Sequence, residues 1–569
     1  MKDIATSSYD FKSIIDNAHV YVDKTGYIYD LVKDKVDARY FISRPRRFGK
    51  SLLLSTLHTL LEGDAKYFRG LAIERLGYDF AESFPVIHID LTSALAGTAA
   101  EVESMLKAMM VGCAESCGVE FSKESLVSPG LMLSDLIRKL ALESQSGKVA
   151  VLVDEYDAPV TRLMDNPKER EAVRDKMHDF YVHLKVCDSK IRFLLITGVS
   201  KFAKMSVFSG LNNLMDISLD PRFAGMLGYV HEDIDSFLSE HVKSLAMKNG
   251  MTYEEMKHEL LSWYDGYRFS PKSTVRVCNP VSLGMALKNS DIKNYWGATG
   301  NASIVYRALR DRILIPEDLD GLTMSESELD ARLDGFRKVE PLLYQTGYLT
   351  ISKVLDSGEL VLSMPNKEVK DALQFGFLDF AFGGSAREIL VNAECSKLRL
   401  ESGDDIKRAL NKILRSVFAA IPYEWACKDE AEAKRSFLIF WKLFGASIKT
   451  EVESSIGRAD VIVECSTEIY IMEFKYGHTA QEALKQIDDR HYADAYIDDS
   501  RQIYKVGVNY NPAIRNIDDP VIVRYEGGDG MAASGPTGPY CGDEQSNRRY
   551  DTIVSAAAQS DGSANAPVL

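Results

Sequence analysis

The sequence predicts a multidomain α/β protein. It should have a parallel sheet flanked by helices, a mainly helical middle region with a β-hairpin, and a C-terminal domain with the element order α-β-β-β-α-β. Three observations predict this fold class. Continuous apolar runs at 149–153 and 191–196 suit parallel strands that are covered on both faces. Helical periodicity dominates residues 222–400, and short strand-like segments replace it from about Lys428 onward.

The bulk composition is that of a water-soluble chain too long for one hydrophobic core. Its 569 residues are 46% hydrophobic and 27% charged, with a formal net charge of −15. This acidic balance excludes a whole-protein attraction to nucleic acid or to an anionic membrane, so a nucleic-acid contact needs a local basic groove or bridging metal ions. No signal-peptide core or membrane-length apolar run is present, and the eight cysteines lack metal-ligand spacing. We therefore expect a cytoplasmic protein with no membrane contact.

We expect four segments along the chain, at residues 1–221, 222–400, 401–525 and 526–569. The last segment is rich in Gly, Ala, Ser and Pro. Such a composition cannot bury enough apolar surface to offset the entropy of ordering the chain. We interpret it as a disordered tail.

A candidate phosphate-binding loop (P-loop) joins the first apolar strand to an apolar helix. It ends in Gly49-Lys50-Ser51, and Leu52-Leu53-Leu54 begins the helix. Strand, tight turn, Gly-Lys-Ser and helix is the layout in which backbone N–H groups and a helix N-terminus meet a polyphosphate. Lys50 would lie along the β- and γ-phosphates of ATP, the Ser51 hydroxyl would bind Mg²⁺, and Gly49 would let the backbone approach closely.

The loop departs from the usual pattern, because Arg44 stands where the first loop glycine is expected. Arg46 and Arg47 make the loop strongly basic. These two side chains either add charge opposite the phosphates or form a solvated basic turn. We keep both as candidate cofactor-binding residues.

The partner that such a loop needs follows the apolar strand at 149–153. Asp154 and Glu155 stand at its C-terminal end, where α/β sheets bind ligands. Asp154 would complete the Mg²⁺ shell, and Glu155 would polarise the attacking water. The strand at 191–196 ends in Thr197-Gly198-Val199-Ser200. Thr197 or Ser200 could sense the γ-phosphate if this strand lies between the loop strand and the acidic strand.

In the middle region, two alternating apolar runs flank Asp356-Ser357-Gly358, which predicts a β-hairpin. Helices followed by such a hairpin indicate a winged-helix module. Arg222 and Arg268 are further candidate phosphate sensors, although packing or loop roles are the alternative for both.

The C-terminal domain is predicted from a run of short elements. We expect an amphipathic helix at 429–444, strands at about 447–453, 459–464 and 468–475, a helix around 480–487, and a strand at 501–508.

Carboxylates occur at matching points on the three strands. Glu451, Asp460 and Glu473 lie on successive strands, and Lys475 shares a face with Glu473 because strands have a period of two residues. Asp460 and Glu473 would bind Mg²⁺ or Mn²⁺ through oxygen, and Lys475 would orient the attacking water and stabilise the charge at phosphorus. Gln486 would position Lys475 or contact a phosphate. The alternative is a solvated salt bridge between Glu473 and Lys475.

Several strings, in this order, resemble a bacterial family: AAA-ATPase-like proteins that carry a C-terminal PD-(D/E)XK nuclease-superfamily domain. The matching strings are YVDKT at 21–25, RPRRFGKS at 44–51, DEYDAP at 154–159, SVFSGLNN at 206–213, YDGYRF at 264–269, GYLT at 347–350, TEVESSIGRAD at 450–460, YIMEFK at 470–475 and ALKQI at 483–487. The resemblance covers nearly everything except the tail. It implies an ATP-binding module and a metal-dependent nuclease fold on one chain, with Arg44 as a habit of the family.

Three functions are compatible with these residues. The leading hypothesis is a P-loop ATPase coupled to a metal-dependent phosphodiesterase that acts on nucleic acid, with DNA favoured over RNA. The second is a nucleotide-dependent switch whose nuclease-like domain only binds. The third is an ATPase scaffold without nucleic-acid contact. Homo-oligomerisation remains open in each case.

Overall fold

The computed structural model describes residues 1–525 apart from short gaps. The residues outside the description are 7, 37, 93–96, 162, 164–165, 202–207, 209–210, 212, 297–302, 330–338, 383–405, 407, 421–426, 443–447, 454–457, 466, 497 and 526–569. The tail predicted to be disordered therefore lies outside the described residues. Along the part of the chain that is described, no helix combines the length and the apolar character needed to cross a membrane.

Five parallel strands form the N-terminal sheet, in the order β2-β3-β4-β1-β5. The strands are β1 (Arg39–Ser43), β2 (Val86–Asp90), β3 (Val149–Asp154), β4 (Ile191–Gly198) and β5 (Met215–Asp216). β4 lies between β1 and β3, and its register pairs Ile42 with Thr197 and Val153 with Ile196. The P-loop after β1 and the acidic residues at the end of β3 therefore meet at one edge, with Thr197 between them.

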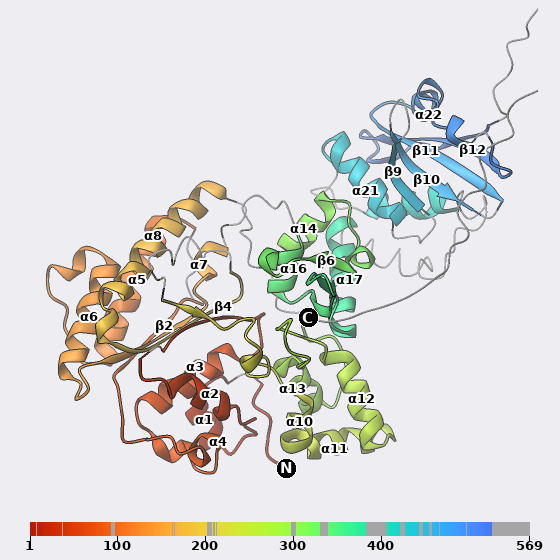
Figure 1. Ribbon diagram of the computed structural model, residues 1–569. Coiled ribbons are helices and arrows are strands. Elements are labelled where there is room, and N and C mark those ends of the chain that lie inside the picture. Colours follow the sequence, from red (N-terminus) through yellow and green to blue (C-terminus); the bar gives the residue numbers. More distant parts are fainter. Residues whose placement is uncertain are drawn as a thin grey trace, which may run out of the picture. The chain divides into compact units, whose positions relative to one another are not determined.

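Helices cover both faces of this sheet (Figure 1). α5 (Ala99–Ser116), α6 (Pro129–Glu143) and α8 (Pro167–Val186) pack on one face, and α2 (Thr25–Val32) and α3 (Lys50–Leu61) pack on the other. In β3, Val151 packs in the core with α5, α6 and α8, whereas Leu152 packs in the core with α2 and α3. Successive side chains of the strand point to opposite faces of the sheet. This explains why the run at 149–153 is apolar without alternation.

Short helices complete the N-terminal part. They are α1 (Phe11–Asp16), η1 (Ala65–Phe68), α4 (Ala72–Arg75), η2 (Ser125–Val127), α7 (Ala158–Thr161) and η3 (Asp188–Lys190). Two of the longer helices begin at side-chain caps. Ser128 accepts the Leu131 N–H at the start of α6, and Thr98 and Glu101 form a capping box at the start of α5.

The middle region is mainly helical, as predicted. Its elements are η4 (Pro221–Phe223), α10 (His231–Asp233), η5 (Ile234–Leu238), α11 (Ser239–Asn249), α12 (Tyr253–Tyr264), α13 (Pro280–Asn289), α14 (Ser303–Asp311), η7 (Pro316–Leu319), β6 (Leu322–Met324), α15 (Glu326–Leu329), α16 (Glu340–Thr346), β7 (Thr350–Val354), β8 (Leu360–Ser363) and α17 (Lys367–Phe382). The predicted hairpin is confirmed, since β7 and β8 pair antiparallel across Asp356-Ser357-Gly358. The pairing of β6 with β8 was not predicted, and assignment as a winged helix stays a prediction.

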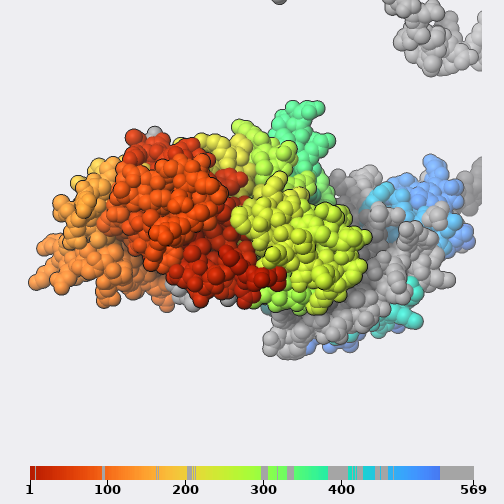
Figure 2. Space-filling view, turned by 90° about the horizontal axis from the view of Figure 1, so that it is seen from below, coloured from red at the N-terminus to blue at the C-terminus, as the bar shows by residue number. Residues whose placement is uncertain are grey.

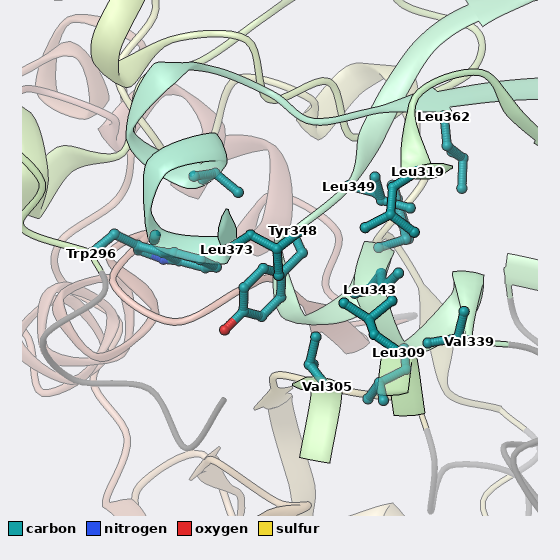
Figure 3. Close-up of a cluster of buried hydrophobic side chains, with 14 of the residues drawn as sticks. Trp296, Val305, Leu309, Leu319, Val339, Leu343, Tyr348, Leu349, Leu362 and Leu373 are labelled. Carbon is teal, nitrogen blue, oxygen red and sulfur yellow. The ribbon is translucent and has the colours of Figure 1, made fainter. Parts of the chain in front are cut away.

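The core of the middle region is built from helices and hairpin together. Figure 3 shows Leu309, Leu343, Leu349 and Tyr348 converging in it. N-terminal residues also pack on this region: Ile4 shares a buried cluster with α11 and α13, and Lys24 forms an ion pair with Asp233. Figure 2 shows the same neighbourhood, with the red N-terminal residues beside the yellow-green stretch.

The C-terminal sheet confirms the predicted α-β-β-β-α-β order and adds two strands. The elements are η9 (Ala409–Leu414), α20 (Arg415–Ala420), α21 (Glu430–Lys442), β9 (Ile448–Glu453), β10 (Arg458–Glu464), β11 (Glu468–Tyr476), α22 (Ala480–Asp489), η11 (Asp494–Tyr496), β12 (Gln502–Asn511), β13 (Asn516–Ile517) and β14 (Val521–Arg524). The sheet order is β13-β12-β11-β10-β9, and β14 also pairs with β12. β11 and β12 are parallel, whereas β9, β10 and β11 pair antiparallel.

A buried carboxyl in α17 makes stability depend on pH. Glu368 is fully buried, and its Oε1 accepts the N–H groups of Tyr295 (2.8 Å) and Trp296 (2.9 Å). Burial raises the pKa of Glu368 to about 7 from an ordinary 4.5. Because the folded state holds this proton to a higher pH than the unfolded chain, the contribution to stability is full below about pH 4.5 and declines as the pH rises to about 7. The loss is roughly 3 kcal/mol.

We therefore expect Glu368→Gln to flatten the pH dependence and to make the protein more stable than wild type at pH 8. Urea unfolding at pH 5 and pH 8 measures both effects. The exposed Glu359→Gln variant serves as the matched control. Equal slopes in wild type and Glu368→Gln would contradict the buried-carboxyl account.

Candidate functional site

The P-loop turns through two residues with left-handed backbone conformation. Arg47 has φ 70° and Gly49 has φ 94°, and Gly49 caps the N-terminus of α3. Glycine adopts this conformation without the steric cost that a Cβ adds. The turn directs the first N–H groups of α3, which have no partner inside the helix, toward the edge of the sheet where β3 and β4 end.

Lys50 lies inside the loop. It is 4% exposed, and its Nζ donates to the carbonyls of Arg44 (2.9 Å) and Pro45 (3.1 Å). The same ammonium forms an ion pair with Glu155 at 3.2 Å. The structure therefore brings two predicted site residues from β1–α3 and β3 into direct contact.

Ser51, Asp154 and Thr197 form one hydrogen-bonded cluster. The Ser51 hydroxyl donates to Asp154 Oδ2 at 2.6 Å, and the Thr197 hydroxyl donates to Oδ1 at 2.5 Å. Asp154 is only 2% exposed. Hydroxyl and carboxylate oxygens are the ligands that Mg²⁺ prefers, so the donor set fits the metal that the sequence implied.

Glu155 follows Asp154 in a strained backbone conformation, with φ 52°. Burial raises the pKa of its carboxyl, and the nearby Lys50 ammonium opposes the shift. A carboxylate with a raised pKa is a better proton acceptor, and strained residues cluster at functional sites. Both features are typical of a residue that activates water.

The three loop arginines have different surroundings. Arg44 is buried: it donates to the carbonyls of Ser43 and Ser218, its guanidinium lies 4.3 Å from the Phe269 ring centre, and burial lowers its pKa to about 10. Arg47 donates to the Tyr295 carbonyl at 2.8 Å, whereas Arg46 is exposed. The side chain that replaces the first loop glycine therefore points into the protein.

The remaining candidate sensors lie in other contacts. Ser200 donates to Asp157 at 2.6 Å. Arg222 is 68% exposed in an ion pair with Asp220, and Arg268 donates to three loop carbonyls, those of Ser270, Pro271 and Ser273. Of the four candidate sensors, Thr197 is the one that hydrogen-bonds to Asp154.

A cavity beside the P-loop was missed in the sequence. Its volume is about 90 Å³, below the range typical of ligand pockets. Its lining comes from the N-terminal segment with α2, the P-loop with α3, the chain after η4 and the start of α13, and includes Tyr21, Lys24, Gly49, Leu53 and Leu227. No local pattern signals such a cavity, because its walls come from four separate stretches of chain.

The second site lies where the β10–β11 ladder ends. The last paired residues are Val461 and Met472. Asp460 precedes Val461 on β10 and Glu473 comes after Met472 on β11, so the two lie across from each other. Both carboxylates are 3% exposed, and Asp460 Oδ2 accepts the Phe474 N–H at 2.8 Å. The predicted pair is therefore side by side in the sheet.

Glu473 has one satisfied and one unsatisfied oxygen. Lys475 Nζ lies 3.4 Å from Oε1, and Gln486 donates to the same oxygen, whereas Oε2 is buried without a hydrogen-bond partner in the described residues. Burial, followed by the Asp460 charge, raises the pKa of Glu473 to about 7, with Lys475 opposing. A buried carboxylate oxygen without a partner is costly, and a divalent cation would satisfy it. The residues therefore fit a metal.

Two further residues complete the description of this site. Gln486 contacts Glu473 rather than Lys475, which was one expected partner. Glu451 lies in β9, where Thr450 pairs with Val461 and Val452 pairs with Ala459, so the backbone register puts residue 451 across from residue 460. The Glu451 side chain lies outside the described part of the structure.

Lys434 was missed in the sequence. It projects from α21, and its Nζ lies 2.6 Å from Asp460 Oδ1. Its position one turn before the buried Phe437 and Leu438 was the available signal, because it puts a cation at the edge of the buried face of the helix.

These two sites define a chain with a P-loop nucleotide module and a metal-nuclease-like module. Residues 5–208 match the AAA-ATPase-like family, described as predicted AAA-ATPases, and residues 428–519 match the PD-(D/E)XK nuclease superfamily. The chain is 30% identical over 509 residues to a protein of Azotobacter chroococcum mcd 1 named "Uncharacterized protein in vnfD 5'region", covering 88% of this chain and 94% of that protein. The chain belongs to the family of AAA-ATPase-like proteins with a C-terminal PD-(D/E)XK nuclease-superfamily domain.

Proposed function

We propose that this protein is an ATP-dependent nuclease in which the P-loop module binds and hydrolyses ATP, and the C-terminal module cleaves a phosphodiester bond in nucleic acid with a divalent metal. One observation carries the proposal: each site combines buried carboxylate oxygens with a lysine ammonium, Lys50 beside Glu155 and Lys475 beside Glu473. This is the charge arrangement needed to hold a cation beside phosphate oxygens.

At the P-loop, Ser51 and Asp154 would hold Mg²⁺, which supplies a Lewis acid for the phosphates. Lys50 would exchange the carbonyls of Arg44 and Pro45 for phosphate oxygens, since an anion is a stronger partner for an ammonium than a neutral carbonyl. Glu155 would accept a proton from the attacking water. Thr197 fixes the orientation of Asp154 through its 2.5 Å hydrogen bond.

The cavity beside Gly49 would take part of the nucleotide base. Its lining includes the apolar side chains of Leu53 and Leu227, which suit a flat base, whereas the Lys24 ammonium beside them is already paired with Asp233. Because the cavity adjoins the loop, one nucleotide could occupy both.

At the second site, Asp460 and Glu473 would hold Mg²⁺ or Mn²⁺, which lowers the pKa of a bound water and polarises the phosphate. Gln486 holds Glu473 in place through Oε1 and leaves Oε2 available. Lys475 provides positive charge beside the reacting phosphate. A phosphodiester in DNA is the expected substrate, and the superfamily match supports nucleic acid as the partner.

The test is a cleavage assay on labelled single- and double-stranded DNA and RNA, with Mg²⁺ or Mn²⁺, and with ATP, a non-hydrolysable analogue or no nucleotide. We expect metal-dependent cleavage that ATP increases. Tight ATP binding with nucleic-acid binding but no cleavage would replace this proposal with the nucleotide-dependent switch. An absence of both binding and cleavage would favour the scaffold.

A further inference from the structure

Lys434 occupies one of the two oxygens of Asp460. Its Nζ lies 2.6 Å from Oδ1, while Oδ2 accepts the backbone N–H of Phe474. The lysine side chain is 32% exposed, whereas the Asp460 side chain is 4% exposed. The ammonium therefore reaches from the solvent-accessible side onto a buried carboxylate.

Lys434 and the Phe474 N–H differ in how easily they can leave Asp460. Phe474 is buried in β11, and its ring packs 4.8 Å from that of Phe437 on α21, so its N–H is fixed by the core. Lys434 has a flexible stem and an exposed portion, so its ammonium can swing toward solvent. A cation that binds Asp460 must compete with Lys434 for Oδ1.

Two ammonium groups lie beside the two carboxylates of the site. Asp460 and Glu473 provide the negative charges, and Lys434 and Lys475 provide the positive ones. A divalent cation would add positive charge at the carboxylates, and a phosphodiester anion would bring negative charge beside it. If Lys434 leaves Asp460, its ammonium can contact this phosphodiester anion.

We propose that Lys434 is an exchangeable counter-ion, which yields Asp460 to the divalent metal and then contacts a phosphate of the nucleic acid beside that metal. This inference rests on the proposed nuclease function. Lys434 thereby links the two binding events: nucleic acid captures the ammonium that the metal releases, so each ligand favours the other.

If Lys434 has this role, Lys434→Gln should bind Mn²⁺ more tightly and DNA more weakly than the wild type. Loss of the competing cation should raise the affinity of the site for Mn²⁺ about three- to tenfold. Loss of a phosphate contact should weaken binding of double-stranded DNA and lower the slope of log K against log salt by about 0.9. If Lys434 were purely structural, its replacement would not raise the metal affinity and would not change the salt slope.

Both measurements use the full chain. Mn²⁺ binding is followed by calorimetry, and the component removed by Asp460→Asn is assigned to this site. DNA binding is measured with Mn²⁺ in a Lys475→Ala background to suppress cleavage. The matched control is Lys505→Gln, which removes the Lys505–Asp488 pair between β12 and α22 and leaves Lys434 in place.

The outcomes separate this inference from the proposed function. Unchanged or weaker Mn²⁺ binding by Lys434→Gln would overturn the counter-ion role, and an unchanged salt slope would overturn the phosphate contact. If wild type has no component of Mn²⁺ binding that Asp460→Asn removes, the metal site itself fails, and the proposed nuclease function fails with this inference. Normal metal binding by wild type with a Lys434→Gln variant identical to it overturns this inference alone.

Discussion

Replacing Lys50 with methionine is expected to reduce ATP hydrolysis by at least about a thousandfold and to weaken ATP binding strongly. The ammonium supplies positive charge that is preorganised in a buried loop, where electrostatic stabilisation is worth far more than in water. Methionine keeps most of the stem volume, so the loss is chiefly one of charge. Nucleotide binding by calorimetry and phosphate release at saturating ATP measure the two effects.

The Lys50→Met variant also leaves Glu155 without its ion-pair partner. Removing one partner of a buried pair costs roughly 3–5 kcal/mol if the remaining group stays charged, but Glu155 already has a raised pKa and can take up a proton instead. Thermal unfolding therefore has to accompany the activity assays. The exposed Lys66→Met variant is the control, and ATP hydrolysis at the wild-type rate by folded Lys50→Met would refute the P-loop assignment.

Replacing Glu473 with glutamine is expected to abolish cleavage while preserving or raising stability. The substitution is isosteric, but it removes the negative charge and the unpartnered Oε2 with which a metal would be held. It also removes a buried carboxyl whose pKa is raised to about 7, so the folded state no longer carries the cost of ionising that group at pH 8. Cleavage should fall by about a thousandfold or more, and the melting temperature should not fall.

Loss of cleavage without loss of stability distinguishes a residue of the site from a structural residue. A structural glutamate would lose stability and activity together when it is changed. The exposed Glu430→Gln variant controls for the change in net charge. Cleavage by Glu473→Gln at the wild-type rate, measured with Mg²⁺ and with Mn²⁺, would rule out this carboxylate as a metal ligand.

Local pattern was enough to predict which strands would carry the two clusters. Ser51 and Asp154 are 103 positions apart, yet the loop before Ser51 follows one apolar strand, Asp154 ends another, and the carboxyl ends of parallel strands meet at one edge. Asp460 and Glu473 are likewise brought together by a simple antiparallel register. In both cases the residue type, its place on a strand and the strand direction determine the contact.

The direction of a side chain and its contacts with distant parts of the chain could not be predicted from local sequence pattern. Nothing near Arg44 indicates that its guanidinium is buried against Phe269, because that contact joins segments more than 200 residues apart. Lys434 reaches Asp460 only through the docking of α21, and Gln486 faces Glu473 because of the way α22 packs on the sheet. Such contacts depend on tertiary packing, which sequence periodicity does not encode.

The packing of the P-loop extends beyond residues 5–208, the part of the chain that matches the AAA-ATPase-like family. Phe48 packs its ring 4.7 Å from that of Tyr267 and 5.2 Å from that of Phe269, and Arg44 stacks on Phe269 as well. A fragment truncated at residue 221 would lack Tyr267 and Phe269 and would therefore expose Phe48 and Arg44 of the P-loop. The nucleotide module is therefore not autonomous: its most local motif is completed by chain synthesised well after it, and the shortest competent fragment must extend at least through residue 269.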